Sequence, residues 1–108
     1  MVHEREWSIS HDHPSLAGHF PGYPVVPGVV LLNEVLDTLR RGSVAPLLVT
    51  GLPIVKFSSP LRPGEVVTIR VEEDASARAT FLCQVDARLI ASGAIEFTSD
   101  TAIQAERV

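Results

Sequence analysis

Hydrophobic and polar residues follow patterns along the chain that predict one helix and several strands. Residues 28–41 are apolar on most sides of a helix, which predicts a helix buried on nearly all sides. Elsewhere the alternation has a period of two, which is typical of strands. The expected strands are 5–9, 47–57, 65–72, 78–86 and 87–97. One buried helix with antiparallel strands is an α+β layout.

The 108 residues are expected to form a single domain spanning 1–108. Prolines at 14, 21, 24 and 27 exclude regular structure between His11 and Pro27. The tail 98–108 has no clear pattern, so we expect it to be frayed.

Composition narrows the possible partners. Thirteen acidic and nine basic residues give a net charge of −4, which argues against nucleic-acid binding. No apolar run approaches the roughly 18 residues of a membrane span. The single Cys83 alternates with Phe81 and Val85, so we expect it in the core of a cytoplasmic, reduced protein. His11 and His13, with His19, could suggest a metal site, but Asp12 would point away in an extended chain and no other acidic or cysteine ligand completes the set, which favours a solvated loop.

The segment 18–28 contains the residues that are candidates for catalysis. A histidine, His19, opens it, and a backbone rich in proline and glycine leads directly to the helix start at Gly28. Histidine exchanges protons near neutral pH, and the free amides of a helix N-terminus stabilise a negative oxygen. This pairing suits polarising a carbonyl group and moving a proton beside it.

The motif His-Phe-Pro-Gly at 19–22, followed by Pro-Val-Val-Pro-Gly at 24–28, resembles the signature of β-hydroxyacyl-(acyl carrier protein) dehydratases in the hotdog-fold superfamily. Val-Lys-Phe at 55–57 and Arg-Pro-Gly-Glu at 62–65 resemble the second block of that family. The likeness spans roughly residues 5–97 and is closer to the small thioester dehydratase-like branch than to the housekeeping enzyme.

The resemblance implies a hotdog fold, in which a curved antiparallel sheet wraps around one long central helix. It implies a homodimer with two active sites at the interface, with a hexamer as the alternative. The implied substrate is a 3-hydroxyacyl thioester on acyl carrier protein or coenzyme A. Loss of water gives the trans-2-enoyl thioester, without a cofactor, in fatty-acid-like or secondary lipid synthesis.

The resemblance also assigns site residues. His19 matches the catalytic histidine, and the Gly28 amide matches the group that binds the thioester carbonyl. Flanking residues are assigned to substrate binding: Phe20, Tyr23, Pro27 and Val29. For Tyr23, lining the acyl tunnel and simple packing are equal alternatives.

One position departs from the family pattern. Fourteen residues after its histidine, the family has a Glu or Asp from the partner subunit, whereas this chain has Asn33. An amide cannot donate a proton as a carboxylic acid does. Glu34 is the possible alternative acid, but it belongs to a helical stripe expected to face solvent, with Asp37, Thr38 and Arg41. Asn33 shares a face with apolar residues, so we expect Asn33 to point into the site.

Asn33 leaves three functions open. His19 could make both proton transfers of a dehydratase while Asn33 positions the hydroxyl group or a water. The protein could instead be a hotdog thioesterase, which would release a free thiol. It could also bind acyl thioesters or acyl carriers without turnover, beside an active paralogue.

Overall fold

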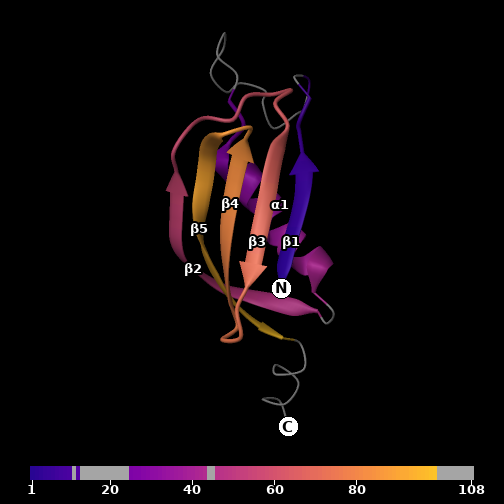
Figure 1. The fold of residues 1–108 in the computed structure, drawn as a ribbon, viewed down its shortest axis with the longest axis vertical. Coiled ribbons are helices and arrows are strands. Elements are labelled where there is room, and N and C mark those ends of the chain that lie inside the picture. The colour runs from indigo at the N-terminus through magenta and orange to yellow at the C-terminus, as the bar shows by residue number, and fades with distance from the viewer. Residues whose placement is uncertain (11, 13–24, 44–45, 100–108) are drawn as a thin grey trace.

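The computed structural model describes residues 1–10, 12, 25–43 and 46–99. Its elements are β1 (Val2–Trp7), α1 (Gly28–Gly42), β2 (Leu47–Phe57), β3 (Val67–Glu73), β4 (Arg78–Val85) and β5 (Arg88–Ser99). His19, Phe20 and Tyr23 lie outside the described residues. The described part confirms the predicted α+β layout (Figure 1).

The five strands form one antiparallel sheet in the order β1-β3-β4-β5-β2, and α1 packs against one face of it (Figure 1). The first strand begins at Val2 rather than at residue 5, because the whole of β1 pairs with β3. At the other end of the chain, Thr98 and Ser99 pair with the start of β2. The expectation of a frayed tail is therefore wrong for these two residues.

The long strand β2 is irregular, and its irregularity curves the sheet. Its pairing with β5 shifts register between Val49 and Gly51 and again between Gly51 and Ile54. Pro53 lies in the second of these intervals and is tolerated because β2 is an edge strand, where a missing N–H group breaks little pairing. The resulting change of direction is visible in Figure 1.

The core lies between α1 and the inner face of β3 and β4. The inward residues predicted from alternation are buried: Val67, Ile69, Val71, Ala79, Phe81 and Cys83. From the helix, Leu31, Val35 and Leu39 pack against them. Burial raises the pKa of Cys83 to about 12, because the thiolate would lose its hydration. Cys83 is therefore a core residue, as predicted, and not a nucleophile.

The helix is covered on fewer sides than predicted. Val29 is 65% exposed and Asn33 is exposed, while Leu32 and Leu36 are half-buried. The sheet covers one side of α1, and no described residue covers the side that carries Val29 and Asn33. The expectation of burial on nearly all sides is wrong for the single chain.

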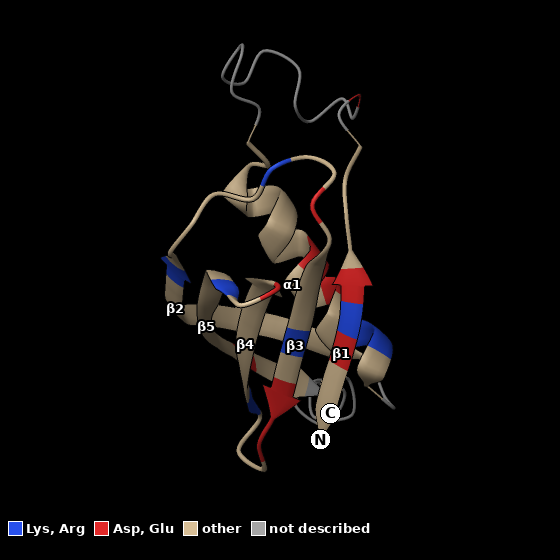
Figure 2. Ribbon diagram, turned by 45° about the horizontal axis from the view of Figure 1, so that its top comes forward, with Lys and Arg blue, Asp and Glu red and all other residues tan. Residues whose placement is uncertain are grey.

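Charged and apolar residues occupy different parts of the surface. Figure 2 shows acidic and basic residues along β1 and β3, where Glu4 and Arg70 form an exposed ion pair at 3.4 Å. The strand β2 exposes apolar side chains instead: Leu48, Leu52, Ile54 and Phe57. No described strand pairs with the outer edge of β2. An exposed apolar edge strand is a ready surface for association.

Candidate active site

The turn between β2 and β3 holds both ends of the segment that contains His19. The Gly64 N–H donates to the Ile9 carbonyl at 2.8 Å, and the Val26 N–H donates to the Leu61 carbonyl at 2.8 Å. Ile9 and Val26 are both buried. Because these anchors share one turn, the segment leaves and rejoins the described structure beside the start of α1.

The helix α1 begins without a capping side chain. Pro27 occupies the N-cap position, and the first turn contains no acidic residue. The first helical bonds reach the Pro27 carbonyl from the N–H groups of Val30 and Leu31, at 3.0 and 3.4 Å. The N–H groups of Gly28 and Val29 precede these and have no acceptor within the helix. The helix start therefore offers two donors and a partial positive charge to a ligand oxygen.

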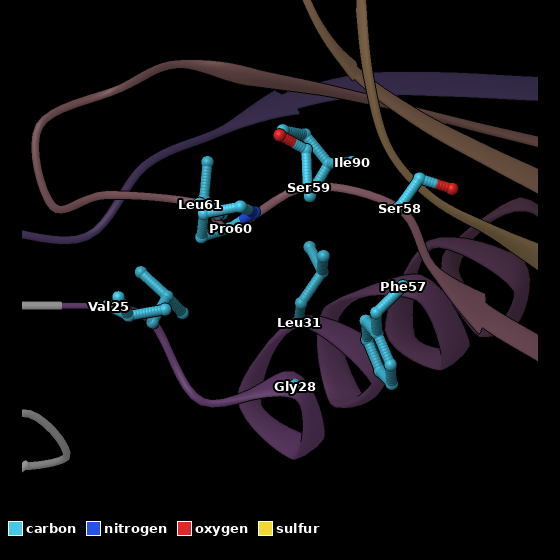
Figure 3. A pocket seen from close by; sticks show the side chains of 10 residues that line it. Val25, Gly28, Leu31, Phe57, Ser58, Ser59, Pro60, Leu61 and Ile90 are labelled. Atoms are coloured by element: carbon cyan, nitrogen blue, oxygen red, sulfur yellow. The ribbon is translucent and has the colours of Figure 1, made fainter.

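A cavity of about 380 Å³ lies beside this helix start (Figure 3). Leu31 from α1, Leu61 from the turn and Ile90 from β5 form apolar walls, and Phe57 and Ser58 continue the wall at the end of β2. Among the described residues, none with a charged side chain lines the cavity. Its volume is near the lower end of the roughly 300–1,000 Å³ range of small-molecule sites. These walls suit an uncharged acyl group.

Gly28 allows the ring of Phe57 to approach the helix start. A β-carbon at position 28 would lie 2.7 Å from the Phe57 Cζ atom, a distance that real β-carbons almost never show. The absence of a side chain thus brings the Gly28 backbone and the Phe57 ring to the same side of the cavity (Figure 3). The motif predicted Gly28 as a site residue, whereas Phe57 was not among the predicted site residues.

Ile90 is a cavity residue that alternation could not reveal. The pattern of β5 places Leu89 and Ala91 on one face and Ile90 on the other. In the structure, Leu89 and Ala91 both pair with β4 while Ile90 is skipped, which is the signature of a β-bulge. Ile90 is buried, and its carbonyl accepts the Ser58 N–H at 2.8 Å. This hydrogen bond joins the bulge of β5 to Ser58, another residue that lines the cavity.

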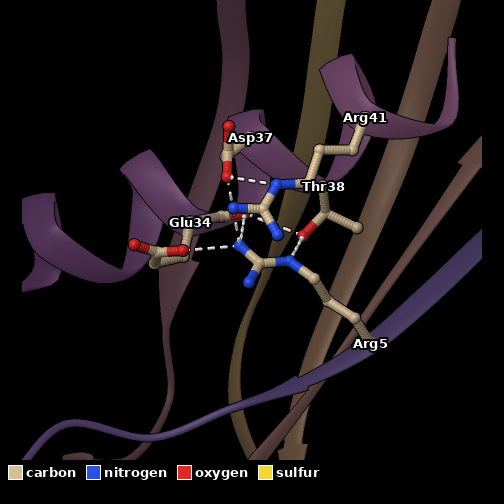
Figure 4. A network of polar contacts seen from close by, with 5 residues as sticks. All are labelled: Arg5, Glu34, Asp37, Thr38 and Arg41. Atoms are coloured by element: carbon tan, nitrogen blue, oxygen red, sulfur yellow. Dashed lines mark hydrogen bonds and ion pairs between the residues drawn. The ribbon is translucent and has the colours of Figure 1, made fainter.

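The polar stripe of the helix faces solvent only in part: Arg41 is exposed, whereas Glu34 and Thr38 contact Arg5 of β1 (Figure 4). Arg5 on β1 donates from Nε to Thr38 Oγ1 at 2.8 Å, and from Nη2 to Glu34 Oε2 at 2.5 Å and to the Glu34 carbonyl at 3.0 Å. Thr38 is buried and Glu34 is half-buried. Asp37 completes the network with ion pairs to Arg5 at 3.7 Å and Arg41 at 2.8 Å. The long side chain of Arg5 thus covers Glu34 and Thr38.

The two candidates for the acid position therefore differ in their surroundings. The carboxylate of Glu34 is engaged by Arg5, whereas Asn33 is exposed on the same side of α1 as Val29. Neither residue lines the cavity of its own chain. The catalytic assignments of His19, Asn33 and Glu34 stay predictions.

An ion pair braces the turn that anchors the His19 segment. Arg88 contacts Glu65 Oε2 through Nη2, and its Nη1 donates to the Pro60 carbonyl at 3.2 Å. Glu65 Oε1 accepts the Arg62 N–H at 2.8 Å. The hydrogen bond from Arg88, and next that from the Arg62 backbone, lower the pKa of Glu65 below 4.5.

We expect Glu65→Gln to lower the free energy of unfolding at neutral pH by about 1 kcal/mol, because the pair is partly exposed. A lowered carboxylate pKa stabilises the fold above the unfolded-state value, and that contribution is lost as pH falls through the folded value. The difference from wild type should therefore shrink below pH 4.5. Urea titrations across this pH range measure it, with Glu72→Gln on the exposed face of β3 as the control. A loss of stability that is constant with pH would contradict the assignment.

The described residues contain no group of three His, Cys, Asp or Glu side chains that could hold a metal ion. His11 and His13, which were weighed as metal ligands, lie outside them. Within the part of the chain that the structure describes, no helix is long and apolar enough to cross a membrane.

Comparison of the fold with solved structures gives close matches. The chain superposes on a protein of the dehydratase heterocomplex ApeI:P from Xenorhabdus doucetiae with a TM-score of 0.79 and 24% identity, over 88% of this chain and 87% of the other. The fluoroacetyl-CoA-specific thioesterase FlK matches with a TM-score of 0.68 and 13% identity, over 95% and 96% of the two chains. At these identities the likenesses establish the fold, which is the hotdog fold predicted from the sequence.

Sequence comparison identifies the family. The 3-hydroxyacyl-(acyl-carrier-protein) dehydratase FabZ of Chlamydia trachomatis serovar L2 is 30% identical over 105 residues, covering 83% of this chain and 67% of the relative. The FabZ of Ruminiclostridium cellulolyticum is 31% identical over 102 residues, covering 83% and 71%. The family model described as ApeI dehydratase matches residues 2–94. The chain therefore belongs to the ApeI-like dehydratase family, a family of hydro-lyases with the hotdog fold.

Proposed function

We propose that this protein converts 3-hydroxyacyl thioesters to trans-2-enoyl thioesters in fatty-acid-like or secondary lipid synthesis. The observation that carries the proposal is the uncapped start of α1, whose Gly28 N–H lies beside a cavity that the described residues line mostly with apolar side chains. The His19 segment ends at this same helix start. A proton acceptor and a carbonyl-binding amide are the two groups that the reaction needs.

In the proposed reaction, the Gly28 N–H binds the thioester oxygen, and the helix dipole stabilises the charge that develops there. His19 removes a proton from the carbon next to the thioester carbonyl. The protonated His19 then gives this proton to the hydroxyl group on the next carbon, which leaves as water. The electron pair of the broken C–H bond forms the new double bond. Asn33 of the second subunit holds the leaving hydroxyl group or a water in place.

The carrier and the compartment belong to the same proposal. The FabZ relatives are named for substrates on acyl carrier protein, and a FlK structure contains coenzyme A. We propose that this chain takes its thioester on one of these two carriers. The lone, buried Cys83 fits a reducing, cytoplasmic location.

The test is incubation with a crotonyl thioester while both the ultraviolet absorbance of the enoyl group and the release of free thiol are followed. Loss of the absorbance without thiol release is hydration, the reverse of the proposed reaction. Thiol release would support the thioesterase alternative, which Asn33 favours because hydrolysis does not require the family's acid. Binding with neither change would identify an acyl-binding protein.

We also propose a homodimer, with a hexamer as the alternative assembly. The unpaired edge of β2 exposes Leu48, Leu52 and Ile54, and the adjacent helix exposes Val29 and Asn33. A two-fold axis beside this edge would cover the apolar residues. It would also bring the Asn33 of one subunit toward the His19 segment of the other.

Sedimentation should show a dimer at micromolar concentration. Ile54→Lys should shift the protein to a monomer, because burying two lysines at a symmetric interface is unfavourable. Glu4→Lys, at an exposed position on the opposite edge strand, is the matched control. A wild-type protein that stays monomeric would contradict the shared active site.

A further inference from the structure

Phe57 is a cavity residue that does not belong to the hydrophobic core. Its side chain is 53% exposed, and its ring lies against Gly28 at the cavity wall (Figure 3). The cluster of core residues, including the partly buried residues packed against it, does not contain Phe57. The ring therefore lines the cavity and is not part of the buried core.

The backbone of Phe57 is fixed while its ring has room to move. Phe57 pairs with Ala91 of β5, and the next N–H along the chain, that of Ser58, donates to the Ile90 carbonyl at 2.8 Å. These bonds hold the α-carbon in place. In the single chain, the exposed ring is then a part of this wall that side-chain rotation can displace.

Three of the other apolar wall residues cannot retreat in this way. Leu31, Leu61 and Ile90 are between 1% and 3% exposed, so each is packed on all sides. Because the ring of Phe57 lies within contact distance of Gly28, we expect an acyl group whose thioester oxygen is bound at Gly28 to run beside this ring. In Phe57, a longer acyl group thus meets an exposed wall residue beside the bound thioester.

We propose that Phe57 limits the length of the acyl group and makes the protein selective for short-chain thioesters. The inference rests on the proposed function, since it places the thioester at Gly28. The cavity of about 380 Å³, whose described walls are mostly apolar, provides the space in which an acyl group would lie. Phe57 is a specificity-determining residue in this proposal and takes no part in proton transfer.

The test compares Phe57→Ala and Phe57→Leu with wild type on 3-hydroxyacyl thioesters of four and ten carbons. We expect Phe57→Ala to raise the ratio of kcat/KM for the long substrate over the short one by about tenfold or more, the scale of a methylene-sized change in an apolar pocket. Phe57→Leu should give a smaller rise. Val66→Ala, at an exposed apolar position outside the cavity, should leave the ratio unchanged. An equal loss of kcat/KM for both substrates would overturn the proposal.

A second measurement separates this inference from the proposed function. Calorimetry with unreactive amide analogues of the same two chain lengths reports selectivity without turnover. A shifted binding ratio in a protein that processes no thioester would uphold the role of Phe57 while refuting the dehydratase. Turnover with an unchanged ratio would refute the role of Phe57 alone. Because Phe57 lies on the edge strand, sedimentation accompanies each variant, and a shift found only with altered assembly would also overturn the proposal.

Discussion

Replacing His19 with alanine should abolish dehydratase turnover, because no other residue of the motif 18–28 exchanges protons near neutral pH. Loss of general acid–base catalysis typically lowers rates by about 10²–10⁴-fold. Here the loss should reach the upper end or beyond, since His19 is proposed to make both proton transfers. The free energy of unfolding should stay within about 1 kcal/mol of wild type, as for substitutions away from a core.

The measurement combines the enoyl absorbance assay with urea unfolding of the same preparation. His3→Gln is the matched control: His3 contacts Glu73 at 2.5 Å and lies against Gly42, at the end of α1 opposite to the candidate site. It should lower stability slightly and leave turnover intact. Full activity of His19→Ala would show that the assigned base is wrong.

The features that the sequence predicted are those set by local chemistry. The helix start at Gly28 follows from a proline-rich loop meeting an apolar helical pattern, and the strands β3 and β4 follow from regular alternation. The motif at 19–28 indicates the protein family, and the family in turn implies the hotdog fold. Each of these signals lies within a short stretch of chain.

The features that the sequence missed depend on distant residues. Nothing near Glu34 indicates that Arg5 will bind it, since the two meet only after β1 pairs with β3 beside the helix. Ile90 enters the cavity through a bulge, which displaces a single residue without altering the pattern around it. Phe57 reaches Gly28 because the sheet closes around the helix start. Tertiary packing therefore decided which side chains surround a backbone site that the motif had already located.

The engagement of Glu34 by Arg5 sharpens the prediction for Asn33. Asn33→Asp keeps the length and shape of the side chain and restores the carboxyl group that the family has at this position. We expect dehydratase activity to rise tenfold or more, on the scale of general-acid catalysis. The new carboxyl group must hold a proton to donate it, and the apolar subunit interface that we propose would favour the neutral form. The rise should therefore be largest at mildly acidic pH and decline as the carboxyl group ionises.

Glu34→Gln is the control that tests whether Asn33 or Glu34 is the residue of α1 that points into the active site. Glu34 bonds to Arg5 through its side chain and lies on the side of α1 that faces β1, so its replacement should cost about 1 kcal/mol of stability and little activity. The enoyl assay on both variants decides the question. An inactive Glu34→Gln together with an unchanged Asn33→Asp would make Glu34 the working acid and Arg5 the residue that must release it. If neither substitution alters turnover and no thioester is processed, Asn33 marks a protein that binds acyl thioesters without dehydrating them.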